Sequence, residues 1–197
     1  NKKETIAIKW LKRYTGTDPS IYGDWILLTN FQNYVEKFSK KFNTPINGKG
    51  GPMTSATNDQ GLSIINFGIG SSNAATIMDL LSGISPKGVL FLGKCGGLKR
   101  TTDIGHFILP TAAIRGEGTS NDYFPQEVPA MPSFKLHKYV SEILVDNKIE
   151  YKANINHPLF EVMQKVVFKH LGLEDVVETV LERMGDVDQI ILVGDYA

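Results

Sequence analysis

Several features are scarce or absent in this chain, and each absence excludes a class of protein. Only one cysteine, Cys95, occurs in 197 residues, so no internal disulfide can form and a reducing cytoplasm is expected. Free cysteines usually pack as small hydrophobes, so Cys95 is expected to be buried rather than to act as a nucleophile. The chain shows no signal peptide and no apolar run long enough to span a membrane, so membrane contact is not expected.

Net charge is also absent, because 21 Lys and Arg residues balance 21 Asp and Glu residues. A protein without a broad basic field is not expected to bind nucleic acid or a membrane surface. The remaining composition, 42% hydrophobic and 21% charged residues, is ordinary for a globular protein. The length suits one domain, or one domain and a further fragment, with a sizeable hydrophobic core.

Residues 62–97 organise the rest of the chain. Apolar, β-branched runs predict buried strands at Leu62–Phe67 and Gly88–Leu92. Between them, residues 74–81 have helical composition, and a side chain among residues 71–73 is expected to cap the first turn. A strand–helix–strand unit with a right-handed crossover makes both strands parallel. The turns after the strands then meet at one edge, where open α/β sheets bind ligands.

Two glycine-rich turns lie at that edge. Gly68 and Gly70 allow a ligand to approach the backbone closely, and the helix that begins near Ser71 offers unpaired N–H groups to an anion. Lys94 adds a positive charge in the second turn, beside Gly96. A tight turn without a ligand is the alternative for one GxG motif. Two such turns, one of them with a lysine, favour a binding site.

Periodicity predicts the other elements. Apolar spacing indicates helices over residues 2–14, 32–42 and 134–146, and strands over residues 25–28, 53–57 and 107–114, with 53–57 forming a hairpin with 62–67. Trp10 and Tyr14 are aromatic residues that could stack on a base, but their helical spacing favours the core. Thr29 and Asn30 follow a strand and are expected to cap the next helix rather than to touch a ligand.

A polar, glycine-punctuated loop follows at residues 115–125. Loops of this length usually have a function when they are ordered. The side chains that could supply donors and acceptors to a nucleotide or a sugar are Arg115, Glu117, Thr119, Ser120 and Tyr123. A solvated surface loop is the alternative interpretation.

Five segments carry a family resemblance: WLKRYTG, DWILLTNF, INFGIGSSNAATIMDLL, FLGKCGGL and AAIRGEGTSNDYFPQEVPA. Through them, residues 3–152 resemble AMP nucleosidase, of the nucleoside phosphorylase superfamily. The resemblance implies an α/β fold around a mixed, partly closed sheet flanked by helices. It also implies hydrolysis of the N-glycosidic bond of AMP to adenine and ribose 5-phosphate, through an oxocarbenium-like transition state. Relatives are usually homo-oligomers, often hexamers, and no cofactor or metal is expected.

The resemblance also suggests roles for individual positions. Gly68 and Gly70 match the family's glycine turn beside the sugar and the nucleophile. Lys94 stands where phosphorolytic relatives have a small hydroxyl residue that binds inorganic phosphate. Phe91 stands where such relatives often have a phosphate-binding arginine, and the loss of that arginine favours water as the attacking group. The loop of residues 115–123 resembles the family's substrate-side loop as a block.

The family pattern stops after Lys152. The family's Met-Glu pair, which grips the ribose hydroxyls, is expected next but does not appear. A later Ser-Asp element, whose aspartate protonates the leaving base, is also missing from the sequence. The catalytic residues therefore stay unknown, and no general acid is assigned.

Residues 153–197 resemble a different family, winged-helix regulators fused to a nucleotidyltransferase. Two helices near residues 158–170 and 173–184 and a strand at residues 189–193 are predicted there. His157 and His170, without other ligands at metal-binding spacing, are expected to be surface or capping residues.

The predicted organisation is therefore a partial phosphorylase-like domain, residues 1–152, followed by a segment of different origin, residues 153–197. The C-terminal half of the fold is expected to be missing or replaced, by fusion or truncation. Three functions stay open. These are hydrolysis of AMP, a nucleotide-binding scaffold without catalysis, and a regulator linked to a nucleotidyltransferase.

Overall fold

The computed structural model describes residues 2–97 and 104–146, and the chain divides into two compact units. The first unit comprises residues 1–97 and 115–128, and the second comprises residues 98–114 and 129–197. The predictions for residues 153–197, including both helices, the strand and the two histidines, lie outside the described residues. In the described part of the chain, no helix is long and apolar enough to cross a membrane.

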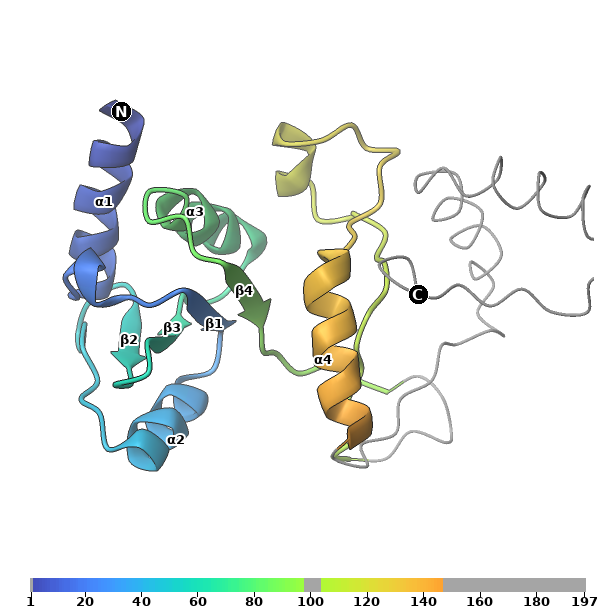
Figure 1. Ribbon diagram of the computed structural model, residues 1–197. Coiled ribbons are helices and arrows are strands. Elements are labelled where there is room, and N and C mark those ends of the chain that lie inside the picture. Colours follow the sequence, from blue (N-terminus) through green and yellow to red (C-terminus); the bar gives the residue numbers. More distant parts are fainter. Residues whose placement is uncertain (1, 98–103, 147–197) are drawn as a thin grey trace, which may run out of the picture. The chain divides into compact units, whose positions relative to one another are not determined.

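The first unit is built around a four-stranded mixed sheet (Figure 1). Its strands, in the order β2-β3-β1-β4, are β1 (Trp25–Thr29), β2 (Thr54–Thr57), β3 (Leu62–Asn66) and β4 (Gly88–Phe91). β1 pairs in parallel with both β3 and β4, and β2 pairs antiparallel with β3. The predicted hairpin is confirmed. The two strands of the predicted crossover unit are also parallel, but β1 lies between them.

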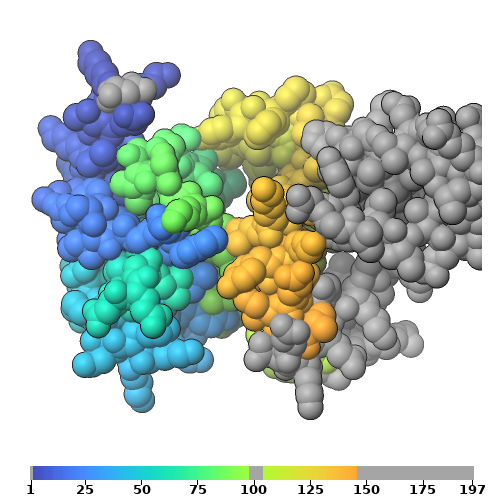
Figure 2. Space-filling view, in the orientation of Figure 1, coloured from blue at the N-terminus to red at the C-terminus, as the bar shows by residue number. Residues whose placement is uncertain are grey.

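Helices cover both faces of this sheet. α1 (Lys2–Thr15) and α3 (Ser71–Leu81) pack together on one face, and α2 (Gln32–Phe42) packs on the other, against β2 and β3 (Figure 1). In the space-filling view the side chains of α2, in light blue, lie beside those of β2 and β3, in turquoise (Figure 2). This three-layer arrangement confirms the predicted α/β class.

Alternation along the strands divides the core into two clusters. Ile26, Leu28 and Ile65 face α1 and α3, where they pack with buried residues such as Leu11 and Ile77. The neighbouring residues Leu27 and Ile64 point to the other face and pack with Val35 and Phe38 of α2. Successive side chains of a strand project to opposite faces, so a strand covered on both sides is apolar at every position. This requirement explains the continuous apolar runs in the sequence.

Two predictions about helix starts are wrong in detail. α3 begins at Ser71 as expected, but its N-cap residue is Gly70, and no side chain from residues 71–73 caps it. α2 begins at Gln32 with Phe31 as its N-cap, again without a side-chain cap. Thr29 instead accepts a hydrogen bond from the backbone N–H of Phe31 at 3.1 Å, which closes the turn before the helix.

Three predictions about burial also need correction. Trp10 is 41% exposed, because α1 buries the face of Leu11 and Thr15 and turns Trp10 outward. Cys95 is exposed, because it follows the end of β4 instead of lying within it. β4 is only partly buried and ends in the exposed Phe91, since in the described part of the chain only β1 pairs with it. Tyr14 does pack against the core.

In the second unit, the predicted helix is confirmed as α4 (Phe134–Asp146). The predicted strand over residues 107–114 is wrong. Only Ala113 forms an isolated antiparallel bridge, with Ala130. Phe107, Ile108 and Ile114 are more than half exposed. Their composition suits a strand, but a strand also requires a run of hydrogen-bonding partners, and no described segment supplies one.

Candidate functional site

The carboxyl ends of three parallel strands form one edge of the sheet. Thr29 of β1 is in register with Asn66 of β3, and Leu28 is in register with Phe91 of β4. The backbone ladder continues past the strands, because the N–H of Phe67 donates to the oxygen of Thr29 at 3.0 Å. The turn after β1 therefore lies between the turns after β3 and β4, as expected for the ligand-binding edge of such sheets.

The turn after β3 has the open backbone that its glycines predict. Gly68 and Gly70 have φ values of 84° and 104°, which side-chain-bearing residues rarely adopt. A Cβ atom on Gly70 would meet no atom within 4 Å, so the space beside this backbone is free. The first N–H groups of α3 follow directly. A helix start of this kind favours an anion.

Asn66 holds this turn and links it to α2. Its Oδ1 accepts a hydrogen bond from the N–H of Gly68 at 3.0 Å, and its Nδ2 donates to Oε1 of Gln32 at 3.0 Å. The same Gln32 oxygen accepts a hydrogen bond from Thr54 at 2.6 Å. The three partly buried side chains thereby couple the glycine turn to α2 and β2.

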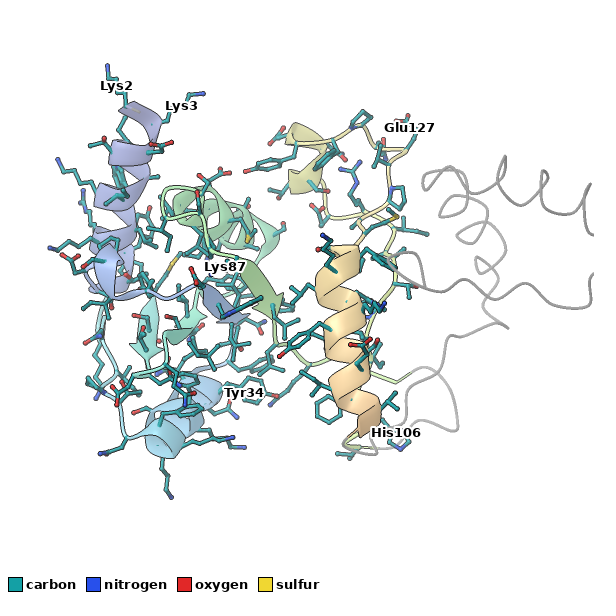
Figure 3. The ribbon with its side chains drawn as sticks, in the orientation of Figure 1. Lys2, Lys3, Tyr34, Lys87, His106 and Glu127 are labelled. Carbon is teal, nitrogen blue, oxygen red and sulfur yellow. The ribbon has the colours of Figure 1, made fainter. Side chains whose placement is uncertain are left out.

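Lys94, in the turn after β4, points toward the turn after β1. Its ammonium group lies 4.5 Å from the ring centroid of Phe31 and 5.6 Å from that of Tyr34, within the range of cation–π attraction. Tyr34 is labelled on α2 in Figure 3. Gly96, two residues after Lys94, is exposed, with open space where a Cβ would stand.

Phe91 adds an exposed aromatic surface at the same edge. Its ring is 57% exposed, packs 5.9 Å from the ring of Phe67, and lies over Gly93. A Cβ atom on Gly93 would stand 2.6 Å from the Phe91 ring, so a side chain there would displace the ring from this position. The position at which phosphorolytic relatives are expected to carry arginine is therefore apolar.

The polar loop is attached to α3 at two points. Ser71, the first residue of α3, shares a hydrogen bond of 2.8 Å with Thr119. Tyr123 donates a hydrogen bond of 2.9 Å from its hydroxyl to Asp79, and this bond raises the pKa of Tyr123 above its ordinary value. The short helix η2 (Thr119–Asp122) thus lies against α3, next to the glycine turn.

Arg115 holds the loop together from inside. Its side chain is only 8% exposed, and its guanidinium nitrogens donate to backbone oxygens of the loop. The acceptors are Val128 at 2.6 Å, Ser120 at 2.8 Å, Phe124 at 3.2 Å, and Pro125. Arginine has five N–H donors and no acceptor, so this guanidinium is committed to the loop. Direct contact between Arg115 and a substrate stays a prediction.

Glu117 shapes the start of η2. Both the hydroxyl and the backbone N–H of Ser120 donate to its carboxylate, the backbone bond measuring 3.1 Å. These bonds from Ser120 hold the pKa of Glu117 below its ordinary value. Glu117 therefore acts like a capping residue of η2, and a role in ribose binding stays a prediction.

The structure thus brings most of the predicted site residues to two neighbouring places. Gly68, Gly70, Ser71 and Thr119 meet at the start of α3, whereas Tyr123 bonds Asp79 near the end of that helix. Arg115, Glu117 and Ser120 bond within the loop, and Lys94 reaches the turn after β1. No described residues form a cluster of three or more potential metal ligands.

Sequence reasoning missed four residues of this region: Phe31, Tyr34, Asn66 and Asp79. The i, i+3 spacing of Phe31 and Tyr34, next to a strand end, was a usable signal for a shared aromatic face. Asp79 has no such signal, because only folding brings it to Tyr123, 44 positions away.

Together, the mixed sheet with helices on both faces and the glycine turn beside a polar loop define an α/β protein whose polar turns gather at the carboxyl ends of its parallel strands. Residues 25–159 match the profile of the Phosphorylase superfamily, and the chain belongs to that superfamily. The resemblance found in the sequence is confirmed for this part of the chain.

Two groups of relatives agree with this placement. AMP nucleosidase of Escherichia coli strain K12 is 26% identical over 164 residues, covering 65% of this chain and 34% of that protein. Uridine phosphorylase of Treponema pallidum is 25% identical over 146 residues, covering 72% of this chain and 57% of that protein. The chain thus spans about a third of the length of the first relative and little more than half of the second.

Solved structures support the same fold. The crystal structure of AMP nucleosidase from Bacteroides thetaiotaomicron superposes with a TM-score of 0.71 at 48% identity, covering 76% of this chain and 63% of that chain. Uridine phosphorylase from Vibrio fischeri superposes with a TM-score of 0.58 at 18% identity, which shows the fold alone.

Proposed function

We propose that this chain carries the nucleotide-binding part of an AMP nucleosidase, which hydrolyses the N-glycosidic bond of AMP to adenine and ribose 5-phosphate. The observation that carries the proposal is the 48% identity to the Bacteroides thetaiotaomicron AMP nucleosidase over 76% of this chain. The strand ends of this chain also suit a phosphorylated ligand, because the open start of α3 and the ammonium of Lys94 both favour an anion.

The residues at the strand ends have different roles in this proposal. The glycine turn lets the sugar approach the backbone at Gly68 and Gly70, and the first N–H groups of α3 bind negative charge. Lys94 supplies a positive charge on the other side of the edge. The loop fixed by Arg115 forms the wall beside the sugar.

The choice of water over inorganic phosphate follows from the position of Phe91. An aromatic ring cannot donate charge-assisted hydrogen bonds to phosphate as an arginine does. Phe91 lies over Gly93 at this edge, so an incoming phosphate would meet an aromatic ring and not a charged donor. Water needs no such partner, and hydrolysis is the reaction that this edge suits.

A nucleotide-binding scaffold without catalysis is the second candidate. It is favoured by the sequence after Lys152, which contains neither the Met-Glu pair nor the Ser-Asp element of the family. The third reading, a regulator linked to a nucleotidyltransferase, depends on residues 153–197 and stays a prediction.

The deciding experiment measures adenine release from AMP by chromatography, in reactions with and without inorganic phosphate. Release that does not depend on phosphate supports the hydrolase. Release that requires phosphate contradicts hydrolysis in favour of phosphorolysis. No release, together with AMP binding in a calorimetric titration, favours the scaffold, and the absence of both rejects the two candidates.

A further inference from the structure

The ammonium group of Lys94 rests on a pair of aromatic rings that the sequence did not reveal. Phe31 is the N-cap residue of α2 and Tyr34 lies in its first turn, with ring centroids 5.8 Å apart in an edge-to-face arrangement of 72°. The Lys94 nitrogen is 4.5 Å and 5.6 Å from these two rings. Two faces near one cation restrict a side chain that otherwise has four rotatable bonds.

The rings hold the charge near the middle of the sheet edge. Phe31 directly follows the end of β1, and β1 lies between β3 and β4. Lys94 leaves the turn after β4, so reaching Phe31 brings its ammonium to the end of β1, the strand that lies between β4 and β3. A lysine at this site without the rings would point into solvent from an exposed turn.

Lys94 keeps its positive charge available. Among residues 2–97 and 104–146, no carboxylate forms an ion pair with it. An aromatic face attracts a cation through its quadrupole but carries no net charge, so the ammonium can still donate to an anion. The rings therefore orient the charge without neutralising it.

Phe31 also makes little contribution to the core. Neither core cluster includes it among the described residues, whereas Tyr34 packs at the margin of the α2 cluster. A large apolar side chain that is only half-buried, outside the core and directly under a cation, is better explained by the cation than by packing.

We propose that Phe31 and Tyr34 are positioning residues that hold the Lys94 ammonium for the phosphate of a nucleoside monophosphate. They thereby make the site select a phosphorylated nucleoside over the free nucleoside. This inference rests on the proposed function for the choice of nucleotide, but it concerns binding and not hydrolysis.

The test compares dissociation constants for AMP and adenosine, measured by calorimetry on the full chain. Phe31→Leu removes the ring, and Phe31→Tyr keeps it. The matched control is Phe42→Leu, since Phe42 at the other end of α2 lies under Lys41 in the same kind of contact, at 5.5 Å. Each variant is also made in a Lys94→Met background, and melting temperatures establish that each one folds.

The expected result is a loss of AMP affinity of about two- to fivefold in Phe31→Leu, with adenosine affinity unchanged. Phe31→Tyr should restore AMP affinity, Phe42→Leu should not change it, and Phe31→Leu should have no further effect once Lys94 is methionine. Tyr34→Leu should act in the same direction as Phe31→Leu, and Tyr34→Phe should be neutral because the ring remains.

Three outcomes overturn the inference: equal losses for AMP and adenosine, a loss that persists without Lys94, or a parent chain that does not bind AMP. The proposed function fails separately. A parent that binds AMP but releases no adenine contradicts the hydrolase, while the binding comparison still decides the role of the two rings.

Discussion

Lys94 shows how one residue acquires a function from its surroundings. Its side chain is exposed, and an exposed lysine usually contributes little to either stability or recognition. Here two aromatic rings restrict its ammonium group, at the edge of the sheet where α3 also begins. The ammonium group is therefore held near one position at the sheet edge instead of moving freely in solvent.

We predict that Lys94→Ala weakens AMP binding by about 1.5–3 kcal/mol, the range for a hydrogen bond to a charged group. Titration calorimetry measures the effect, and the melting temperature should stay unchanged. Lys87→Ala is the matched control, because Lys87 precedes β4 at the opposite edge of the sheet and pairs with Asp24 at 2.7 Å (Figure 3). Equal AMP affinity in the parent and Lys94→Ala would exclude this role.

Arg115 is the contrasting residue, a charge used for internal structure. We predict that Arg115→Met lowers the free energy of unfolding by about 2–3 kcal/mol, because it leaves loop carbonyls without donors. Limited proteolysis should cut residues 115–128 faster, and urea unfolding measures the change in stability. Arg13→Met serves as control, since Arg13 lies over the exposed ring of Trp10 at 5.0 Å. A variant as resistant as the parent would show that the loop does not depend on Arg115.

At the scale of elements, the loop and α3 form one assembly. Ser71 and Asp79 lie about two turns apart on α3, and each has a hydrogen-bonding partner in or beside η2. Two attachment points fix the orientation of a short helix that could not be stable alone. The wall of the candidate site therefore moves with α3.

The order of this loop should depend on pH through Glu117. Its carboxylate accepts hydrogen bonds from Ser120, and its folded pKa is lowered from 4.5. The stabilisation is complete above pH 4.5 and is lost as the pH falls through the lowered pKa, because the free loop binds the proton more readily.

The amide resonance of Ser120 reports this transition in an NMR titration toward acid pH. It should shift with a midpoint below 4.5, and Glu117→Gln should abolish the shift without unfolding the chain. A midpoint at or above the ordinary value would contradict the capping geometry.

At the scale of the whole molecule, the sheet unit is stabilised by a core on both faces of the sheet. Ile77 of α3 is fully buried in the cluster that joins α1, α3 and the strands. We predict that Ile77→Ala lowers the free energy of unfolding by about 2–5 kcal/mol, from lost burial and a new cavity. Ile69→Ala is the matched control, because Ile69 is 81% exposed and should change stability little. Urea unfolding of both variants distinguishes them, and equal losses would place Ile77 outside the core.

Local patterns predicted the elements well. The bounds of α2 and α4 agree with their apolar spacing, and three of the four described strands, β1, β3 and β4, follow apolar runs. The one predicted strand that failed, residues 107–114, has suitable composition but no described partner strand. A strand differs from a helix in this respect, because its hydrogen bonds close with another segment and not within itself.

The site was predicted in part for the same reason. Gly68, Gly70 and Lys94 were found from turns after strands, since the carboxyl ends of parallel strands meet at one edge. Phe31 was missed because the sequence does not show which side chain Lys94, in the turn after β4, will contact. The exposure of Cys95 and Trp10 was missed because periodicity gives the phase of a face but not whether another element covers it.

The sequence by itself determined the α/β class, the helices and strands of the sheet unit, and the edge at which ligands are expected. These follow from periodicity, turn residues and the handedness of crossovers, which act over short stretches of chain. Only the tertiary structure decided that β1 lies between β3 and β4, that Arg115 is committed to its own loop, and that Lys94 rests on Phe31 and Tyr34. The strand order and the Lys94 contact join residues far apart in sequence, and they arise when the chain packs its two apolar faces together. The bonds of Arg115 are local, but which backbone oxygens it reaches depends on the path of the folded loop.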